Sequence, residues 1–300
     1  MARIVIIGGG FAGLESARQL RGSPHSVTVV DPSDTFSWMP NLHEVLSGRK
    51  TASMLSLPRQ RLLTQWGHTA VAERVTQIDA AGQQVLLSGG QHLGYDILIV
   101  ATGGRSAIAG KPQLSTHSHA LRSVDDATRI AQRLAALEAT QRPHHVVIAG
   151  GGFVGVEVLG ELLRRTVPGR HITLLEGGQR LMNGYPRSIH KTVHARLADA
   201  GVRVRMGRRI SAIEPGRVTC TDGVLLPADL TIEALGLGPP PLLAASGLAQ
   251  PGGWAPIRPS LQSVQHDNIF VIGDSAQLGS LSSRCFTDSL VMPGSIPTPH

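Results

Sequence analysis

Short apolar runs alternate with helical patterns at the start of the chain. Residues 4–7 are uninterrupted Ile and Val, residues 8–13 read Gly-Gly-Gly-Phe-Ala-Gly, and residues 14–21 have the pattern of a helix. A second, mainly apolar run at residues 27–30 ends on Asp31. Apolar runs without alternation are typical of strands buried on both faces of a parallel sheet. This stretch therefore predicts a strand, a tight turn, a helix and a second strand.

The glycine spacing and the terminal acid together form a dinucleotide-binding fingerprint. Gly8 permits the turn, Gly10 lets the backbone approach a pyrophosphate, and Gly13 lets the helix pack closely on the strand. The phosphates would lie at the helix N-terminus, where free N–H groups favour negative charge, and Asp31 would accept hydrogen bonds from ribose hydroxyls. The alternative is a tight turn without a ligand. The predicted site comprises Gly8, Gly9, Gly10, Phe11, Ala12, Gly13 and Asp31.

The same pattern recurs in the middle of the chain. Residues 146–149 are apolar, residues 150–155 read Gly-Gly-Gly-Phe-Val-Gly, a helical segment covers 157–163, and a run at 172–175 ends on Glu176. Two complete fingerprints imply two bound dinucleotides, and the simplest chemistry between two dinucleotides is hydride transfer. The second predicted site comprises Gly150, Gly152, Phe153, Val154, Gly155 and Glu176.

Other segments complete an α/β pattern. The apolar run at 97–100 is followed by Ala-Thr-Gly-Gly at 101–104, which brings small residues to the end of a buried strand. Strand patterns at 71–78 and 84–87 predict a β-meander, and Ser123 with Asp126 predicts a capping box before an amphipathic helix. Residues 41–46 have helical spacing. Packing is one interpretation of that segment, and a position beside a ligand beyond a strand end is the other.

Composition limits the classes of partner. The 300 residues fit two ordinary domains, and an aromatic content of 3% argues against binding of single-stranded nucleic acid. The net charge is +7, but the densest basic group alternates with apolar residues, as on the exposed face of a half-buried strand. Attraction of anionic nucleotides or of an anionic lipid surface is the alternative. That group comprises Arg203, Arg205, Arg208 and Arg209.

Targeting and cysteine patterns add further expectations. The sequence shows no signal peptide and no apolar run that approaches about 18 residues, so we expect a cytoplasmic protein without a transmembrane segment, with at most weak peripheral membrane contact. The cysteines are Cys220 and Cys285, without a CxxC or a nearby pair. A disulfide framework or a metal site is therefore not expected.

These motifs resemble those of the FAD/NAD(P)-dependent pyridine nucleotide-disulfide oxidoreductases, most closely the branch of type II NADH dehydrogenases and apoptosis-inducing-factor-like proteins. The most branch-specific feature is the continuation of the second glycine motif into Val156-Glu157 and Gly160-Glu161-Leu162, and residues 40–45 resemble the branch's segment beside the flavin. The resemblance covers about residues 2–278 and implies two Rossmann-like domains, the second inserted in the first. The expected division is 1–111 and 233–278 for FAD binding, 112–232 for NAD(H) binding and 279–300 as a disordered tail.

The resemblance also implies roles for single residues. The first fingerprint would hold the adenosine half of FAD, Val75 would contact its adenine, and Asp274 would bind its ribityl chain. The second fingerprint would hold NADH, and the Glu176 carboxylate would repel the 2′-phosphate of NADPH. Glu157 would approach the nicotinamide as the catalytic acid, unless it is only a solvated or capped carboxylate. Further cofactor-binding residues would be Ala101, Thr102, Gly103, Gly236 and Gly273.

The expected activity is hydride transfer from NADH to FAD, followed by electron transfer to a quinone-like acceptor. The absence of a cysteine between Phe36 and Gly48 disfavours a disulfide substrate. Two alternatives remain. One is a reductase of a small iron–sulfur electron carrier, for which the positive charge suits an acidic partner. The other is a truncated, non-catalytic dinucleotide-binding module, because the branch's C-terminal helix and third domain are not found after Asp274.

Overall fold

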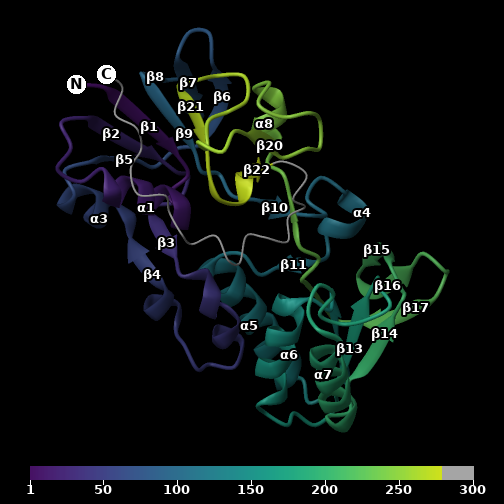
Figure 1. Cartoon of the computed structure of the whole chain (residues 1–300). Coiled ribbons are helices and arrows are strands. Elements are labelled where there is room, and N and C mark those ends of the chain that lie inside the picture. The colour runs from purple at the N-terminus through teal and green to yellow at the C-terminus, as the bar shows by residue number, and fades with distance from the viewer. Residues whose placement is uncertain (279–300) are drawn as a thin grey trace. The chain divides into compact units, whose positions relative to one another are not determined.

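The computed structural model describes residues 1–278 and is shown in Figure 1. The described chain forms two compact units. Unit 1 comprises residues 1–36, 58–105 and 239–278, and unit 2 comprises residues 37–57 and 106–238. The sequence assigned 37–57 to the first domain, whereas in the structure its contacts lie within unit 2. The tail expected at 279–300, with Cys285, lies outside the described residues.

Unit 1 is built on a five-stranded parallel sheet in the order β21-β9-β1-β2-β5. Along the first strand, Val5 and Ile7 contribute to one hydrophobic cluster, and Ile4 and Ile6 contribute to another. The unalternated apolar run is therefore buried on both faces, as the sequence predicted. The strands are β1 (Arg3–Ile7), β2 (Ser26–Val30), β5 (Thr69–Val71), β9 (Ile97–Val100) and β21 (Ile269–Val271).

A β-meander lies between β5 and β9 in the sequence. The strand predicted at 71–78 is wrong, because β5 ends at Val71 as a parallel neighbour of β2 and an antiparallel sheet begins at Val75. That sheet has the order β6-β7-β8, which confirms the meander itself. The remaining elements of unit 1 are β6 (Val75–Asp79), β7 (Gln84–Leu87), β8 (His92–Gly94), β20 (Ala255–Ile257), β22 (Ala276–Leu278), α1 (Phe11–Gln19), α3 (Arg59–Gln65), α8 (Pro241–Ala245) and the 3-10 turn η3 (Gly273–Ser275).

Unit 2 repeats the architecture with a parallel sheet in the order β11-β18-β12-β13-β14. Val146 and Ile148 face one hydrophobic cluster, and Val147 faces another, so this run is also buried on both faces. Together the two sheets confirm the α/β class. The strands are β11 (His119–Ala120), β12 (His144–Ala149), β13 (Arg170–Glu176), β14 (Arg203–Met206) and β18 (Leu230–Glu233), and a second meander comprises β15 (Ile210–Glu214), β16 (Gly216–Cys220) and β17 (Leu225–Ala228).

The helices of unit 2 bear out two sequence expectations. The Ser123 hydroxyl accepts the Asp126 N–H at 3.1 Å and caps the long helix α5. The segment predicted as a helix at 41–46 is a 3-10 turn followed by α2, and Leu42 and Leu46 are buried in the hydrophobic cluster of unit 2. The elements are η1 (Met39–Asn41), α2 (His43–Leu46), η2 (Ala52–Leu55), α4 (Pro112–Ser115), α5 (Val124–Ala139), α6 (Phe153–Leu163) and α7 (Arg187–Asp199).

Four short strands carry the chain between the units. They are β3 (Thr35–Ser37), β4 (Ser56–Pro58), β10 (Arg105–Ser106) and β19 (Leu237–Gly238). Within each large sheet the strand order reverses beside the strand that precedes the glycine turn, between β1 and β9 and between β12 and β18. Ligands of open α/β sheets bind beyond the carboxyl ends of the strands at such reversal points. The topology therefore predicts that ligands bind at the two glycine turns.

Candidate functional site

The first glycine turn follows β1 and has both closed and open positions. Gly8 has a φ of +100°, and a Cβ there would lie 2.3 Å from the Ala101 carbonyl oxygen. A Cβ on Gly13 would lie 1.8 Å from the Gly8 carbonyl oxygen. A Cβ on Gly10, by contrast, would meet no protein atom within 4 Å. Packing therefore requires glycine at Gly8 and Gly13, whereas at Gly10 the space in front of the backbone is open.

Asp31 directly follows β2 and is held by the turn. Its Oδ2 accepts the Gly9 N–H at 2.7 Å, and its Oδ1 accepts the Ser33 N–H at 2.9 Å. A guanidinium nitrogen of Arg59 lies 3.1 Å from Oδ1. No pattern in the sequence marks Arg59, because only tertiary packing brings this first residue of α3 against the turn.

The other predicted residues of unit 1 gather near the same strand ends. Thr102 Oγ1 lies 3.0 Å from Ser275 Oγ, and the Ser275 hydroxyl donates to the Gly103 carbonyl at 3.0 Å. A Cβ on Gly273 would lie 3.0 Å from the Ala12 Cβ, so η3 lies against the start of α1. The structure thus brings together the segments at 101–103, 273–275 and the glycine turn. Asp274 lies in η3.

Two predicted residues make apolar contacts in unit 1. Val75 is the first residue of β6, and its side chain is buried in the hydrophobic cluster of unit 1. The Phe11 ring packs edge to face on Phe36 with the ring centroids 5.0 Å apart. A backbone contact of Val75 with adenine stays a prediction.

The second glycine turn reproduces the first in unit 2. Gly150 has a φ of +114°, and a Cβ there would lie 2.2 Å from the Ala234 carbonyl oxygen. A Cβ on Gly155 would lie 1.9 Å from the Gly150 carbonyl oxygen, whereas a Cβ on Gly152 would meet no protein atom within 4 Å. Glu176 accepts the N–H groups of Gly151 at 2.8 Å and Gly178 at 2.6 Å. The turn and the acid therefore have the same relation in both units.

A cavity of about 580 Å³ opens over the second turn. Its lining includes Gly152, Glu176, Arg208, Arg209 and the predicted Gly236. The four arginines of the basic group therefore have two different environments. Arg203 and Arg205 are exposed on β14, as the half-buried-strand interpretation predicted. Arg208 and Arg209 line the cavity instead. Arg208 also forms an ion pair with Asp222 at 2.6 Å.

The side chains of Phe153 and Val154 begin α6 and are exposed to solvent. The Phe153 ring stacks on Tyr185 with the ring centroids 6.4 Å apart. Both residues lie in the first turn of the helix. A role in binding a dinucleotide stays a prediction for both.

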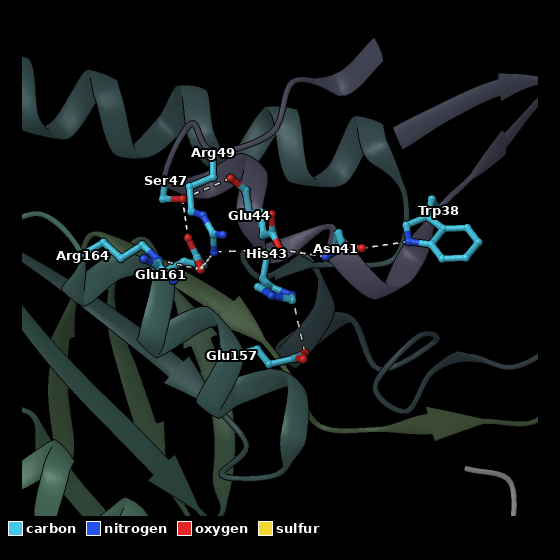
Figure 2. Close-up of polar contacts among 9 residues, drawn as sticks. All are labelled: Trp38, Asn41, His43, Glu44, Ser47, Arg49, Glu157, Glu161 and Arg164. Atoms are coloured by element: carbon cyan, nitrogen blue, oxygen red, sulfur yellow. Dashed lines mark hydrogen bonds and ion pairs between the residues drawn. The ribbon is translucent and has the colours of Figure 1, made fainter. Parts of the chain in front are cut away.

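Glu157 lies further along α6 and faces α2 within unit 2 (Figure 2). Its Oε2 is 3.5 Å from Nδ1 of His43. Burial raises the pKa of Glu157 to about 7. Burial also lowers the pKa of His43, against smaller opposing effects of Glu161 and Glu44. Glu157 is therefore a partly buried carboxyl group beside an imidazole, and its role as the catalytic acid stays a prediction.

Glu161, a second acid of α6, accepts more hydrogen bonds than Glu157. Glu161 accepts hydrogen bonds from the Ser47 hydroxyl, from Arg164 Nε at 2.8 Å and from Arg49 at 3.4 Å (Figure 2). Burial, the largest effect, raises its pKa, but the bonds from Ser47 and Arg164 outweigh it, so the pKa of Glu161 lies below its ordinary value. These contacts fasten segment 37–57 to α6.

None of the helices within residues 1–278 combines the length and the apolar character of a membrane-spanning segment. In the same part of the chain, no group of three or more His, Cys, Asp or Glu side chains is arranged to hold a metal ion.

Comparison with known proteins decides the family. Residues 2–289 match the family model described as pyridine nucleotide-disulphide oxidoreductase. The chain belongs to this family. It is therefore an FAD-dependent NAD(P)H oxidoreductase, with FAD and NADH as its cofactors.

This oxidoreductase has curated relatives with different acceptors in their names. It is 29% identical to the demethylphylloquinone reductase of Synechocystis, over 92% of this chain and 72% of that protein. It is 30% identical to the putidaredoxin reductase of Pseudomonas putida, over 92% of this chain and 67% of that protein. A solved structure of NDH2 from Plasmodium falciparum in complex with NADH matches with a TM-score of 0.83 and 19% identity, over 92% of this chain and 65% of that one. The chain thus spans roughly two thirds of the length of these proteins.

Proposed function

We propose that this oxidoreductase transfers hydride from NADH, bound by unit 2, to FAD, bound by unit 1, and then reduces a quinone. When bound, the two dinucleotides supply the hydride donor and the two-electron acceptor, and the protein supplies position and exclusion of water. The observation that carries the proposal is the repetition of one cradle. In each unit the third glycine of the turn is open, and an acid is fixed beside the second.

Under this proposal each unit is a Rossmann-like domain, and the second is inserted in the first. The open faces at Gly10 and Gly152 fit a pyrophosphate, because an added Cβ would occupy the space that the phosphates need. The N–H groups at the starts of α1 and α6 would bind the phosphates. Asp31 and Glu176 would accept hydrogen bonds from ribose hydroxyls.

We infer that unit 2 prefers NADH to NADPH. The two oxygens of Glu176 already accept backbone N–H groups, which hold the carboxylate at the cavity. A carboxylate in this position binds a ribose 2′-hydroxyl and repels a 2′-phosphate. Arg208 lines the same cavity, but its charge is partly neutralised by Asp222, which weakens its attraction for a phosphate.

Glu157 would act close to the nicotinamide. It lies on the helix that starts at the pyrophosphate turn, and its pKa of about 7 suits a group that gains and loses a proton near neutral pH. Its partner His43 would orient the carboxyl group.

The acceptor has two candidates. A quinone is supported by the name of the demethylphylloquinone reductase and by that of the type II NADH:quinone oxidoreductase of Mycobacterium tuberculosis, which is 26% identical. An iron–sulfur protein is supported by the putidaredoxin reductase, and by the net charge of +7, which suits an acidic protein partner.

One spectrum tests the proposal. The purified chain, reconstituted with FAD, is expected to show the visible flavin bands, and NADH added without oxygen is expected to bleach them. Addition of a soluble quinone or of an oxidised ferredoxin would then restore the bands, and the faster acceptor identifies the physiological class. A chain that binds FAD but is not bleached by NADH would contradict the proposed reaction.

A further inference from the structure

Arg59 is a buried cation in unit 1 with only 5% of its surface exposed. It begins α3 directly after Pro58. A buried guanidinium is costly unless its N–H groups find acceptors. The acceptors that it finds therefore indicate what the residue does.

The guanidinium joins the glycine turn to the loop after β2. Its Nε donates to the Gly9 carbonyl at 3.0 Å. One terminal nitrogen donates to the Thr35 carbonyl at 2.7 Å, and the other donates to the Ser33 carbonyl and pairs with Asp31 at 3.1 Å. All three guanidinium nitrogens thus have acceptors.

These contacts close a ring of three residues. Arg59 donates to the Gly9 carbonyl, the Gly9 N–H group donates to Asp31, and Asp31 pairs with Arg59. The peptide groups on both sides of Gly9 are therefore held, and a Cβ on Gly9 would lie only 2.1 Å from Arg59 Nε. The next residue in the chain is Gly10, whose face is open.

We propose that Arg59 is a positioning residue for the adenosine half of FAD, acting through the Asp31 carboxylate and the Gly9 peptide. The inference rests on the proposed assignment of FAD to unit 1. Arg59 sets the direction of the carboxylate that receives the ribose and the shape of the turn that receives the pyrophosphate. Without the guanidinium, the Asp31 carboxylate and the glycine turn are still present, but they are no longer held in the orientation that binds FAD.

The experiment measures FAD affinity of the full chain after removal and readdition of flavin. Arg59→Met is expected to weaken FAD binding about tenfold to a hundredfold, the range for losing hydrogen bonds to a charged group. Arg59→Lys keeps the charge without the fork of donors and is expected to recover only part of the loss. The matched control is Arg61→Met, because Arg61 is exposed on the same helix. NADH affinity, which reports on unit 2, is expected to stay unchanged in every variant.

A double-mutant cycle with Asp31→Asn separates positioning from direct contact. Because Arg59 acts through Asp31 and through the Gly9 peptide that Asp31 also holds, the double variant is expected to lose less FAD affinity than the product of the two single losses. Losses that multiply would overturn the inference and show that the guanidinium contacts the cofactor itself. Arg59 variants with wild-type FAD affinity would also overturn it and leave the proposed function intact. A wild-type chain that binds no FAD would refute the assignment of unit 1 and the inference together.

Discussion

Glu157 gives the sharpest test of the electrostatics of unit 2. Burial raises its pKa from 4.5 to about 7, so the folded chain binds a proton at this site more tightly than the unfolded chain. Between these two pH values the folded state carries more protons, and the free energy of unfolding therefore falls as the pH rises. This decrease in the free energy of unfolding is complete above about pH 7 and absent below pH 4.5. Glu157→Gln removes the ionisation and should stabilise the chain increasingly as the pH rises from 4.5 to about 7, and by a constant amount above that.

The size of the effect follows from the shift. At about 1.4 kcal/mol per pKa unit, the raised pKa of Glu157 corresponds to about 3 kcal/mol. Because 29% of the side chain is exposed, solvent screens part of the charge, and we expect about 2 kcal/mol. Glu157→Gln should therefore raise the free energy of unfolding by about 2 kcal/mol at pH 8 and by much less at pH 5.

Urea unfolding of the cofactor-free chain at the two pH values measures this difference. Glu161→Gln, on the same helix, is a control with the opposite sign, because the pKa of Glu161 lies below its ordinary value and its charged form is stabilised. That variant should be less stable than the wild type at pH 8. The reasoning about Glu157 is refuted if Glu157→Gln changes stability equally at both pH values or destabilises the chain at pH 8.

Three further variants test other parts of the site. Gly152→Ala should leave the free energy of unfolding within about 1 kcal/mol of wild type, because its Cβ meets no protein atom, and calorimetry should show a loss of NADH affinity. Glu176→Arg should raise the ratio of kcat/KM for NADPH over NADH at least about tenfold, and an unchanged ratio would count against Glu176 as the selecting residue. Ser47→Ala removes a donor to the buried Glu161 and should cost about 1–3 kcal/mol in urea unfolding, and an unchanged midpoint would show that Arg49 and Arg164 suffice.

The local elements were predictable because each has a local physical cause. The runs at 4–7 and 146–149 are apolar at every position, which requires burial on both faces, and Ser123 caps α5 through a hydrogen bond to a residue three positions on. Gly8 and Gly150 have the positive φ that a tight turn needs. Family membership, the α/β class and the cofactors could therefore be predicted from the sequence.

The remaining features depend on contacts that no short pattern carries. Arg59 lies 50 residues from the glycine turn that it holds, and its sequence neighbours give no sign of burial. Segment 37–57 follows the first strand–helix–strand unit directly, yet its contacts lie in unit 2, where Ser47 donates to Glu161. Glu73 and Arg74 interrupt the apolar pattern at the break, but only the pairing of β5 with β2 and of β6 with β7 shows that two separate strands meet there.

The two cradles differ in one respect that bears on their occupants. Each acid accepts the N–H group of the second glycine and one further backbone N–H group. Asp31 has in addition the buried cation of Arg59, whereas within residues 1–278 Glu176 has no ion pair. A carboxylate fixed before binding costs less to order when the ligand arrives, which favours tight binding. The first cradle is therefore suited to a cofactor that stays bound and the second to one that exchanges in each turnover, as FAD and NADH must in the proposed reaction.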